Sequence, residues 1–180
     1  FARTDRRNPT LTVLPNDAWG IDSEGLVIGN NGEAWICEEY ATSVWHLDTA
    51  YRALERYTPF AQEPQDMAID SIYGKRRPNR GFEGVAYTPN GRIYAIVQNQ
   101  LNNPDNSLEN ASRLHRILEI DPQTGQQRSF GYEHAAPMGA IRNKDRKIGD
   151  MVAVNNTQFL VLEHAERNGW NEKNVYLVDL

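Results

Sequence analysis

The sequence predicts an all-β protein. Apolar runs of about four to eight residues recur along the chain, and Asn, Gly, Pro and Asp separate them, which is typical of short strands joined by tight turns. Almost no segment shows helical periodicity. Of the 180 residues, 39% are hydrophobic and 24% charged, so the chain can bury a core. Three related segments also repeat, which indicates a repeat architecture.

Each repeat begins with a hairpin that has an acidic residue near its start. In each hairpin a strand of small apolar residues turns at Asn-Gly or at a pair of Asn residues, and a more hydrophobic strand returns. The hairpins are DSEGLVIGNNGEAWICEE at residues 22–39, GFEGVAYTPNGRIYAIVQN at 81–99 and IGDMVAVNNTQFLVLEH at 148–164.

Further strands follow each hairpin. The third strands of the repeats are SVWHLD at 43–48, RLHRILEID at 113–121 and NVYLVDL at 174–180. A fourth, more polar strand follows twice, at 52–60 and 126–134, and the sequence stops before a third copy. Four antiparallel strands per repeat predict the blades of a β-propeller, at about 22–60, 81–134 and 148–180. A β-sandwich with coincidental self-similarity is the alternative.

Three blades cannot close a ring, since propellers use about four to eight. We therefore expect a single, partial propeller domain over residues 1–180. The remainder of a propeller, or a second copy, would cover its open blade edges. The segment NPTLTVLP at 8–15 is a candidate outer strand of a further blade.

Charge and composition exclude several function classes. The net charge of −5 argues against a nucleic-acid binder that works through a basic field. No run approaches the roughly 18 apolar residues that a membrane helix needs. The single cysteine, Cys37, excludes an intrachain disulfide, and neither a P-loop nor a dinucleotide-binding glycine motif occurs.

Paired carboxylates are the most informative candidates for a site. Residues opposite each other in an antiparallel hairpin point to the same face, and their index sum is constant. The pairs predicted in this way are Glu24–Glu38, Glu83–Gln98 and Asp150–Glu163. Two adjacent carboxylates repel unless a proton, an arginine or a metal cation compensates, and oxygen ligands suit Ca²⁺ or Mg²⁺. Alternatively, each acid caps a turn or accepts hydrogen bonds from neighbouring backbone amides.

Long, basic loops are expected on the side of the molecule that carries the acids. They cover 61–80, 99–112, 133–147 and 164–173, and long loops on a rigid scaffold often carry the site. Arg80 and Arg113 adjoin the repeated strands, which can hold them rigidly. Because arginine matches the oxygens of phosphate, the pattern predicts a metal ion beside an anionic ligand. Solvated loop charges are the alternative.

With these residues in view, the chain resembles the phytase-like family, propeller proteins described as having esterase-like activity of phytase. The resemblance covers nearly the whole chain. Its motifs are DSEGL at 22–26, WICEE at 35–39, NRGFEGVAYTPNGRIYAIVQN at 79–99, SRLHRILEIDPQTG at 112–125, KIGDMVAV at 147–154 and FLVLEHAERNGW at 159–170. Gln98 departs from the family pattern, which often has a second glutamate there.

The resemblance implies a metal-dependent phosphoric ester hydrolase, exported to the periplasm or the extracellular space, that acts on a small phosphate ester. The implied metal is Ca²⁺, or alternatively Mg²⁺. Its implied ligands are Asp22, Glu24, Glu38, Glu83, Asp150 and Glu163. The implied substrate-binding residues are Arg80, Arg113, Arg167 and Glu39, and the implied catalytic residues are Glu24, Glu83 and Asp150. Two other functions stay open: a non-catalytic propeller that binds a small anion or a protein partner, and a calcium-dependent lactonase-like hydrolase.

Overall fold

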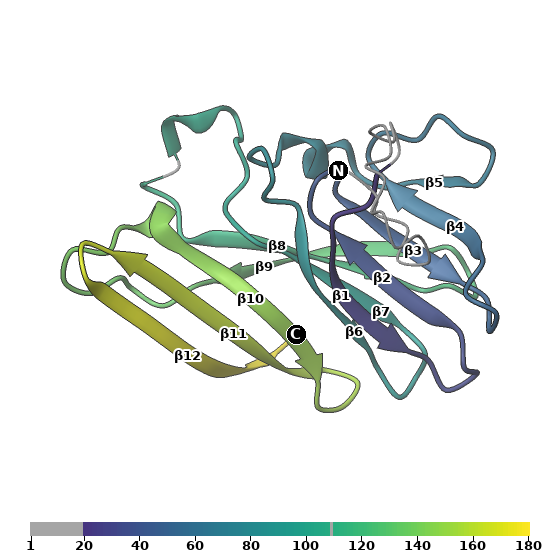
Figure 1. Ribbon diagram of the computed structural model, residues 1–180. Helices are drawn as coiled ribbons and strands as arrows, with labels where there is room; N and C mark the ends of the chain where they lie inside the picture. The colour runs from purple at the N-terminus through teal and green to yellow at the C-terminus, as the bar shows by residue number, and fades with distance from the viewer. Residues whose placement is uncertain (1–19, 109) are drawn as a thin grey trace, which may run out of the picture.

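The computed structural model describes residues 20–108 and 110–180. Within them the protein is all-β, as predicted, with three sheets and three short 3-10 helices (Figure 1). No helix among these residues has the length and apolar character needed to cross a membrane. The predicted strand at 8–15 lies outside the described residues.

The strands of each sheet follow one another in chain order. The first sheet contains β1 (Ser23–Ile28), β2 (Ala34–Glu38), β3 (Ser43–Leu47), β4 (Ala53–Thr58) and β5 (Asp66–Ala68). The second contains β6 (Phe82–Tyr87), β7 (Ile93–Val97), β8 (Leu114–Ile120) and β9 (Gln127–Glu133), and the third contains β10 (Arg146–Ala153), β11 (Gln158–Arg167) and β12 (Trp170–Asp179). The 3-10 helices are η1 (Ser71–Lys75), η2 (Asn106–Leu108) and η3 (Asn143–Asp145).

Each sheet is built from one of the three repeats, with two differences from the prediction. The segment 61–80, expected to be a loop, contains β5, which pairs parallel with β4. The expected loop at 164–173 was wrong, because β11 and β12 continue through it and meet at a tight turn. Asn168 and Gly169 form that turn with φ of 51° and 81°, as an Asn-Gly hairpin turn requires.

The first strands of the three sheets lie side by side, with β6 between β1 and β10 (Figure 1). Glycine makes this approach possible. A Cβ atom added at Gly84 would lie 2.5 Å from the backbone nitrogen of Met151, and one at Gly25 would lie 3.0 Å from that of Val85. The starts of β1, β6 and β10 are thereby held close together.

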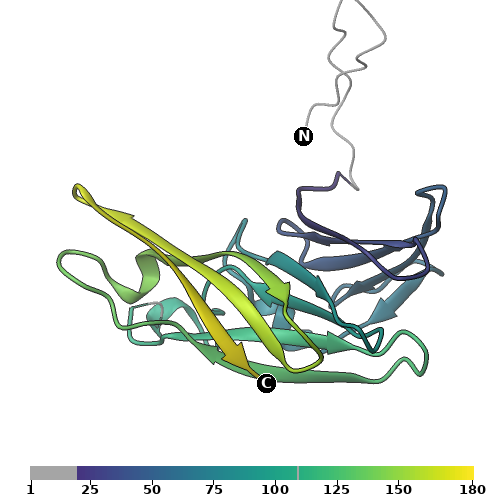
Figure 2. The same ribbon diagram turned by 90° about the horizontal axis from the view of Figure 1, so that it is seen from below.

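Two hydrophobic clusters hold the sheets to one another. The cluster between the first and second sheets includes Trp35, Cys37, Tyr57, Phe82 and Ile93. The cluster between the second and third includes Tyr94, Ile96, Ile117, Met151 and Phe159. Seen from below, the β11–β12 hairpin extends away from the first sheet, on the far side of the second (Figure 2). The second sheet therefore packs between the other two sheets, and its first strand, β6, contacts the first strands of both.

Candidate functional site

A β-bulge lies near the start of the first strand of every sheet. The pairing shifts by one residue at Glu24 in β1, at Glu83 in β6 and at Gly149 in β10. A bulge adds one residue to a strand and re-aims its side chain, and such features are common beside active sites. The bulges also break the constant index sum on which the predicted carboxylate pairs depend.

Glu38 does not face Glu24, so this predicted pair was wrong. Its register partner is Ser23. The Glu38 carboxylate instead accepts hydrogen bonds from the backbone amides of Tyr40 and Ala41, both at 2.7 Å. Burial raises the pKa of Glu38, while these backbone hydrogen bonds act in the opposite direction. The carboxylate therefore stabilises the turn between β2 and β3. This is the alternative role considered for the acids, in which each one caps a turn.

The predicted pair of Asp150 and Glu163 was also wrong. Asp150 is paired with Leu162, because the bulge at Gly149 shifts the strand. Glu163 points into the protein, where its buried carboxylate accepts hydrogen bonds from the Tyr132 hydroxyl and, at 3.1 Å, from Arg146 Nη1. Asp150 is exposed, and its carboxylate accepts the backbone N–H of the next residue at 2.7 Å.

Glu83 and Gln98 are in contact, although Glu83 is bulged out of register. Gln98 Nε2 donates to Glu83 Oε2 at 2.6 Å, and Gln98 Oε1 is buried with no hydrogen-bond partner among the described residues. Burial raises the pKa of Glu83 to about 7, and the charges of Glu24 and Glu39 act in the same direction. The hydrogen bond from Gln98 and the charge of Lys147 oppose this increase.

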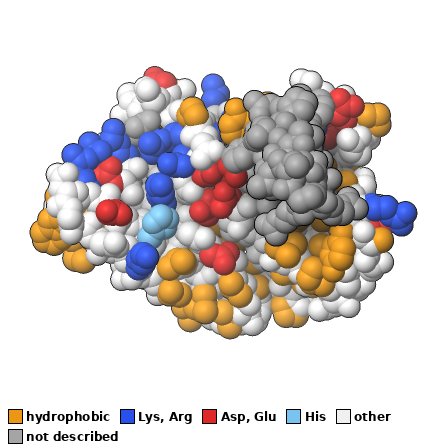
Figure 3. Space-filling model, in the orientation of Figure 1, with side chains coloured by type: hydrophobic (Ala, Val, Ile, Leu, Met, Phe, Trp, Pro, Cys, Tyr) orange, Lys and Arg blue, Asp and Glu red, His pale blue; other side chains and the backbone are white. Residues whose placement is uncertain are grey.

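Three carboxylates converge at the start of β1, and we call them the acidic cluster: Asp22, Glu24 and Glu39. Each offers an oxygen atom, and these atoms all lie within 4.8 Å of one another. Figure 3 shows acidic side chains gathered near the centre of this face, with basic side chains along one side. Burial raises the pKa of Glu24, with Asp22 adding to the effect, and burial also raises the pKa of Glu39. Arg80 Nη1 lies 3.3 Å from Glu39 Oε1 and opposes the shift of Glu39.

The spacing of the acidic cluster fits a calcium ion. Ca²⁺ binds oxygen at about 2.3–2.6 Å, so ligands on opposite sides of the ion lie about 5 Å apart. Mg²⁺ needs about 2.0–2.1 Å, hence a span of about 4 Å. Oxygen atoms that all lie within 4.8 Å of one another are close enough to bind one Ca²⁺ ion together. The unpartnered amide oxygen of Gln98 is a further hard ligand atom beside Glu83.

The bulges also reveal which residues of the three sheets occupy equivalent places. Glu39 N donates to the carbonyl of Asp22 at 3.1 Å, and Gln98 N donates to that of Gly81 at 2.8 Å. In the third sheet, the pair at the corresponding position before the bulge is Lys147 and His164. The equivalent sets are Asp22, Gly81 and Lys147; Glu24, Glu83 and Gly149; Glu39, Gln98 and His164. The charge at these places changes from acidic in the first sheet to basic in the third.

The remaining predicted residues are distributed more widely. Arg113 pairs with Glu133 through a hydrogen bond of 3.0 Å, and Arg167 lies 3.3 Å from Asp145, so the partners of both arginines lie outside the acidic cluster. The Cys37 thiol is buried, which raises its pKa, and the charges of Glu83, Asp150 and Glu24 raise it further. The three predicted catalytic acids therefore all lie near enough to this thiol to affect its pKa.

Two of the four histidines form a buried pair that no sequence pattern predicts. His115 Nε2 and His134 Nδ1 are 2.8 Å apart. Burial lowers the pKa of His115 to about 3 and that of His134 to about 4, so both rings are neutral at pH 7. The pair belongs to the packing between β8 and β9 and takes no part in the acidic cluster.

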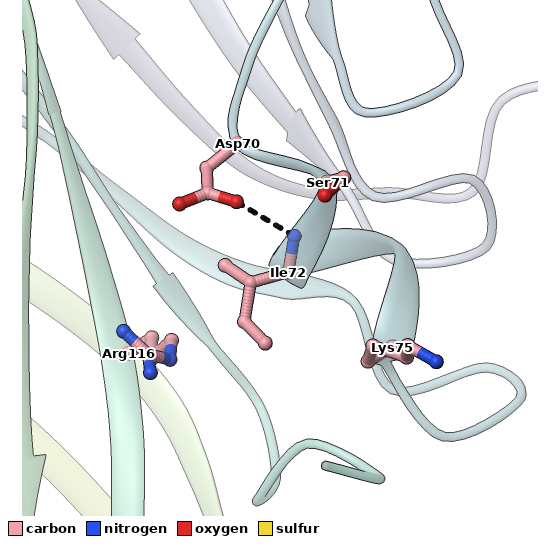
Figure 4. Close-up of a pocket in the computed structure, with 5 residues that line it drawn as sticks. All are labelled: Asp70, Ser71, Ile72, Lys75 and Arg116. Atoms are coloured by element: carbon pink, nitrogen blue, oxygen red, sulfur yellow. Dashed lines mark hydrogen bonds between the residues drawn. The ribbon is translucent and has the colours of Figure 1, made fainter. Parts of the chain in front are cut away.

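A cavity of about 340 Å³ lies between η1 and β8 and is lined by Asp70, Ser71, Ile72, Lys75 and Arg116 (Figure 4). The Asp70 carboxylate accepts the backbone N–H of Ile72 at 2.9 Å and caps η1. The cavity therefore offers two basic side chains and one occupied acid, and no member of the acidic cluster lines it.

Comparison with known proteins gives one relative and several solved structures. An uncharacterized secreted protein of Arthroderma benhamiae (strain ATCC MYA-4681 / CBS 112371) is 29% identical over 147 residues, which cover 62% of this chain and 28% of the relative. A streptogramin B lyase structure is 14% identical with a TM-score of 0.33 and covers 84% of this chain and 53% of its own. Virginiamycin B lyase from Staphylococcus aureus, in selenomethionine-substituted form, is 12% identical with a TM-score of 0.32 and covers 84% of this chain and 54% of its own.

The chain thus spans less than a third of the Arthroderma relative and about half of the two lyases. The family comparison is more extensive, because the model described as "Phytase-like: Esterase-like activity of phytase" matches residues 3–180. The chain belongs to the phytase-like family.

Proposed function

We propose that this protein is a metal-dependent phosphoric ester hydrolase whose metal ion, Ca²⁺, is held by the acidic cluster. The observation that carries the proposal is the convergence of three carboxylate oxygens within 4.8 Å. Carboxylates this close repel one another unless a proton, an arginine or a metal cation compensates, and their spacing allows them to bind one calcium ion. Family membership supports esterase chemistry on phosphate compounds.

Residues around the acidic cluster have properties that such a reaction needs. A bound Ca²⁺ would supply neutralisation of the phosphate charge and polarisation of a water molecule. Arg80 lies beside Glu39 and can hold phosphate oxygens. Glu83, with its pKa raised to about 7, can accept or donate a proton near neutral pH, and Gln98 fixes its orientation.

The partial-propeller architecture and an exported location belong to the same proposal. The first sheet exposes apolar side chains, including Leu26 and Ile28 of β1. Further blades or a second copy would cover them. The Arthroderma relative is described as secreted, which supports export to the periplasm or the extracellular space.

Replacing Glu83 by glutamine tests the hydrolase. Because the substitution removes a proton carrier and keeps the size of the side chain, we expect phosphomonoester turnover in the presence of Ca²⁺ to fall by about 100-fold or more. The measurement is hydrolysis of p-nitrophenyl phosphate with Ca²⁺ and with EDTA, alongside circular dichroism to monitor folding. Glu63→Gln, at an exposed glutamate, is the control and should retain activity.

The alternatives give different results in the same assay. Equal turnover by Glu83→Gln and the unmodified protein would contradict the proposal. Saturable phosphate binding without turnover would favour a non-catalytic propeller. Calcium-dependent turnover of lactones, without turnover of phosphomonoesters, would favour a lactonase-like hydrolase.

A further inference from the structure

A row of three basic side chains crosses the third sheet. Lys147 of β10 pairs with His164 of β11, and His164 pairs with Lys173 of β12. Directly opposed residues have Cβ atoms about 4.5–5.5 Å apart and point to the same face. We call Lys147, His164 and Lys173 the basic row. Figure 3 shows a histidine between two basic side chains on the face that carries the acidic patch, as this register requires.

The basic row faces solvent. Lys173 is exposed, and Lys147 and His164 are partly exposed. Their neighbours along the strands, including Arg146 and Glu163, point to the opposite face and are buried. A ligand can therefore reach all three basic side chains without any change in the sheet.

Two lysine charges flank His164 along the basic row. Burial lowers the pKa of His164, and the charges of Lys147, Lys173 and Arg80 lower it further, so the ring is neutral at pH 7 and can donate one hydrogen bond. An anion placed over the row would offset the positive charge of Lys147 and Lys173.

Acidic side chains border the basic row but do not interrupt it. On the same face, Asp150 lies in the next row toward the turn between β10 and β11. Glu166 lies in the next row toward the turn between β11 and β12. At the Lys147 end, Glu39 and Glu83 lie near enough to affect the charge of Lys147. Lys147 is therefore the member of the row nearest the acidic cluster. His164 and Lys173 lie farther from Glu39 and Glu83, one and two strands away from Lys147.

We propose that the basic row, together with Arg80, binds a phosphoryl oxyanion beside the acidic cluster. This inference rests on the proposed function, because the proposed function identifies the ligand as the phosphate group of the substrate. Lys147 and His164 occupy the places that Asp22 and Glu39 occupy in the first sheet. The same backbone geometry thus presents ligands for a cation on one side and donors to an anion on the other.

A phosphoryl group suits this arrangement better than a carboxylate does. It carries up to two negative charges, and its oxygens point in several directions, so two lysines and the donor nitrogen of His164, from three strands, can contact it together. Lysine acts as a mobile point charge, whereas the arginine at residue 80 offers a planar fork. A bound phosphate would lie between the basic row and a cation held by the acidic cluster.

Phosphate binding without metal tests the basic row. The full chain is treated with EDTA and titrated with inorganic phosphate by isothermal calorimetry at low ionic strength. We expect Lys173→Gln to weaken phosphate binding about five- to tenfold, because one charge-assisted hydrogen bond is lost from a solvent-exposed site. Lys173→Arg should keep most of the affinity, and His164→Gln should also weaken it. Lys75→Gln, which removes a lysine from the cavity of Figure 4, should leave the affinity unchanged.

The basic row is contradicted if phosphate does not bind, or if Lys75→Gln weakens binding as much as Lys173→Gln. If chloride bound as tightly as phosphate, the row would attract anions only through nonspecific charge, and the inference would also be overturned. The outcome is separable from that of the hydrolase. Weaker phosphate binding by Lys173→Gln in a protein without turnover supports the row and refutes the hydrolase. Turnover whose KM is unchanged in Lys173→Gln, with unchanged phosphate affinity, refutes the row alone.

Discussion

Replacing Gly84 with alanine is expected to lower the free energy of unfolding by about 3 kcal/mol or more. The added Cβ atom would lie 2.5 Å from the backbone nitrogen of Met151, and backbone in a packed sheet cannot move aside as a side chain can. The strands β6 and β10 must separate, which would also displace the bulged Glu83. Urea unfolding followed by circular dichroism measures the change.

Gly131→Ala is the matched control, since Gly131 also lies within a strand. The added atom would meet only the end of the Leu114 side chain, at 2.8 Å, and that side chain can rotate. We expect a cost below about 1 kcal/mol. Equal destabilisation by the two substitutions would mean that the close approach of β6 and β10 is not what Gly84 provides.

Arg146→Met should destabilise the protein by about 3–5 kcal/mol, because it leaves buried carboxylates without their counter-charge. The Arg146 side chain is 1% exposed and contacts the carboxylates of Glu163 and Glu172, whose side chains are 0% and 9% exposed. Methionine has a similar length, so the loss is mainly electrostatic. The shift of the urea midpoint at pH 7 measures it.

A surface pair provides the comparison for Arg146. Arg52 pairs with Asp48 at 2.9 Å, but its side chain is 81% exposed. Exposed ion pairs contribute little to stability, so Arg52→Met should leave the urea midpoint nearly unchanged. If Arg146→Met were equally mild, the buried network below the basic row would not be what stabilises the third sheet.

The hairpins could be predicted from the sequence because their signals are local. Asn-Gly or paired Asn residues mark the turns, and apolar runs mark the strands on either side. The turn between β11 and β12 carries the same signal at Asn168 and Gly169, so its interpretation as a loop overlooked available information. The parallel pairing of β5 with β4 depends on contacts distant in sequence, and no local pattern indicates it.

The sequence was sufficient to select acidic residues of the candidate site, but two of the three predicted cross-strand pairs were wrong. Glu24 and Glu83 were selected for their repeated position, and the structure places each of them at a bulge. A shift of one residue moves a side chain to the other face of a sheet. That is why Glu39 joins the acidic cluster, whereas Glu38 turns to the backbone amides of its own turn. The equivalence of His164 to Glu39 was hidden for the same reason.

The most direct test of the acidic cluster is calcium binding to the metal-free protein, measured by isothermal calorimetry. We expect one saturable site, with affinity weakened at least about tenfold in Glu39→Gln and retained in Glu133→Gln, whose glutamate is exposed and pairs with Arg113. Absence of saturable calcium binding, or equal affinity of Glu39→Gln and the unmodified protein, would contradict the account.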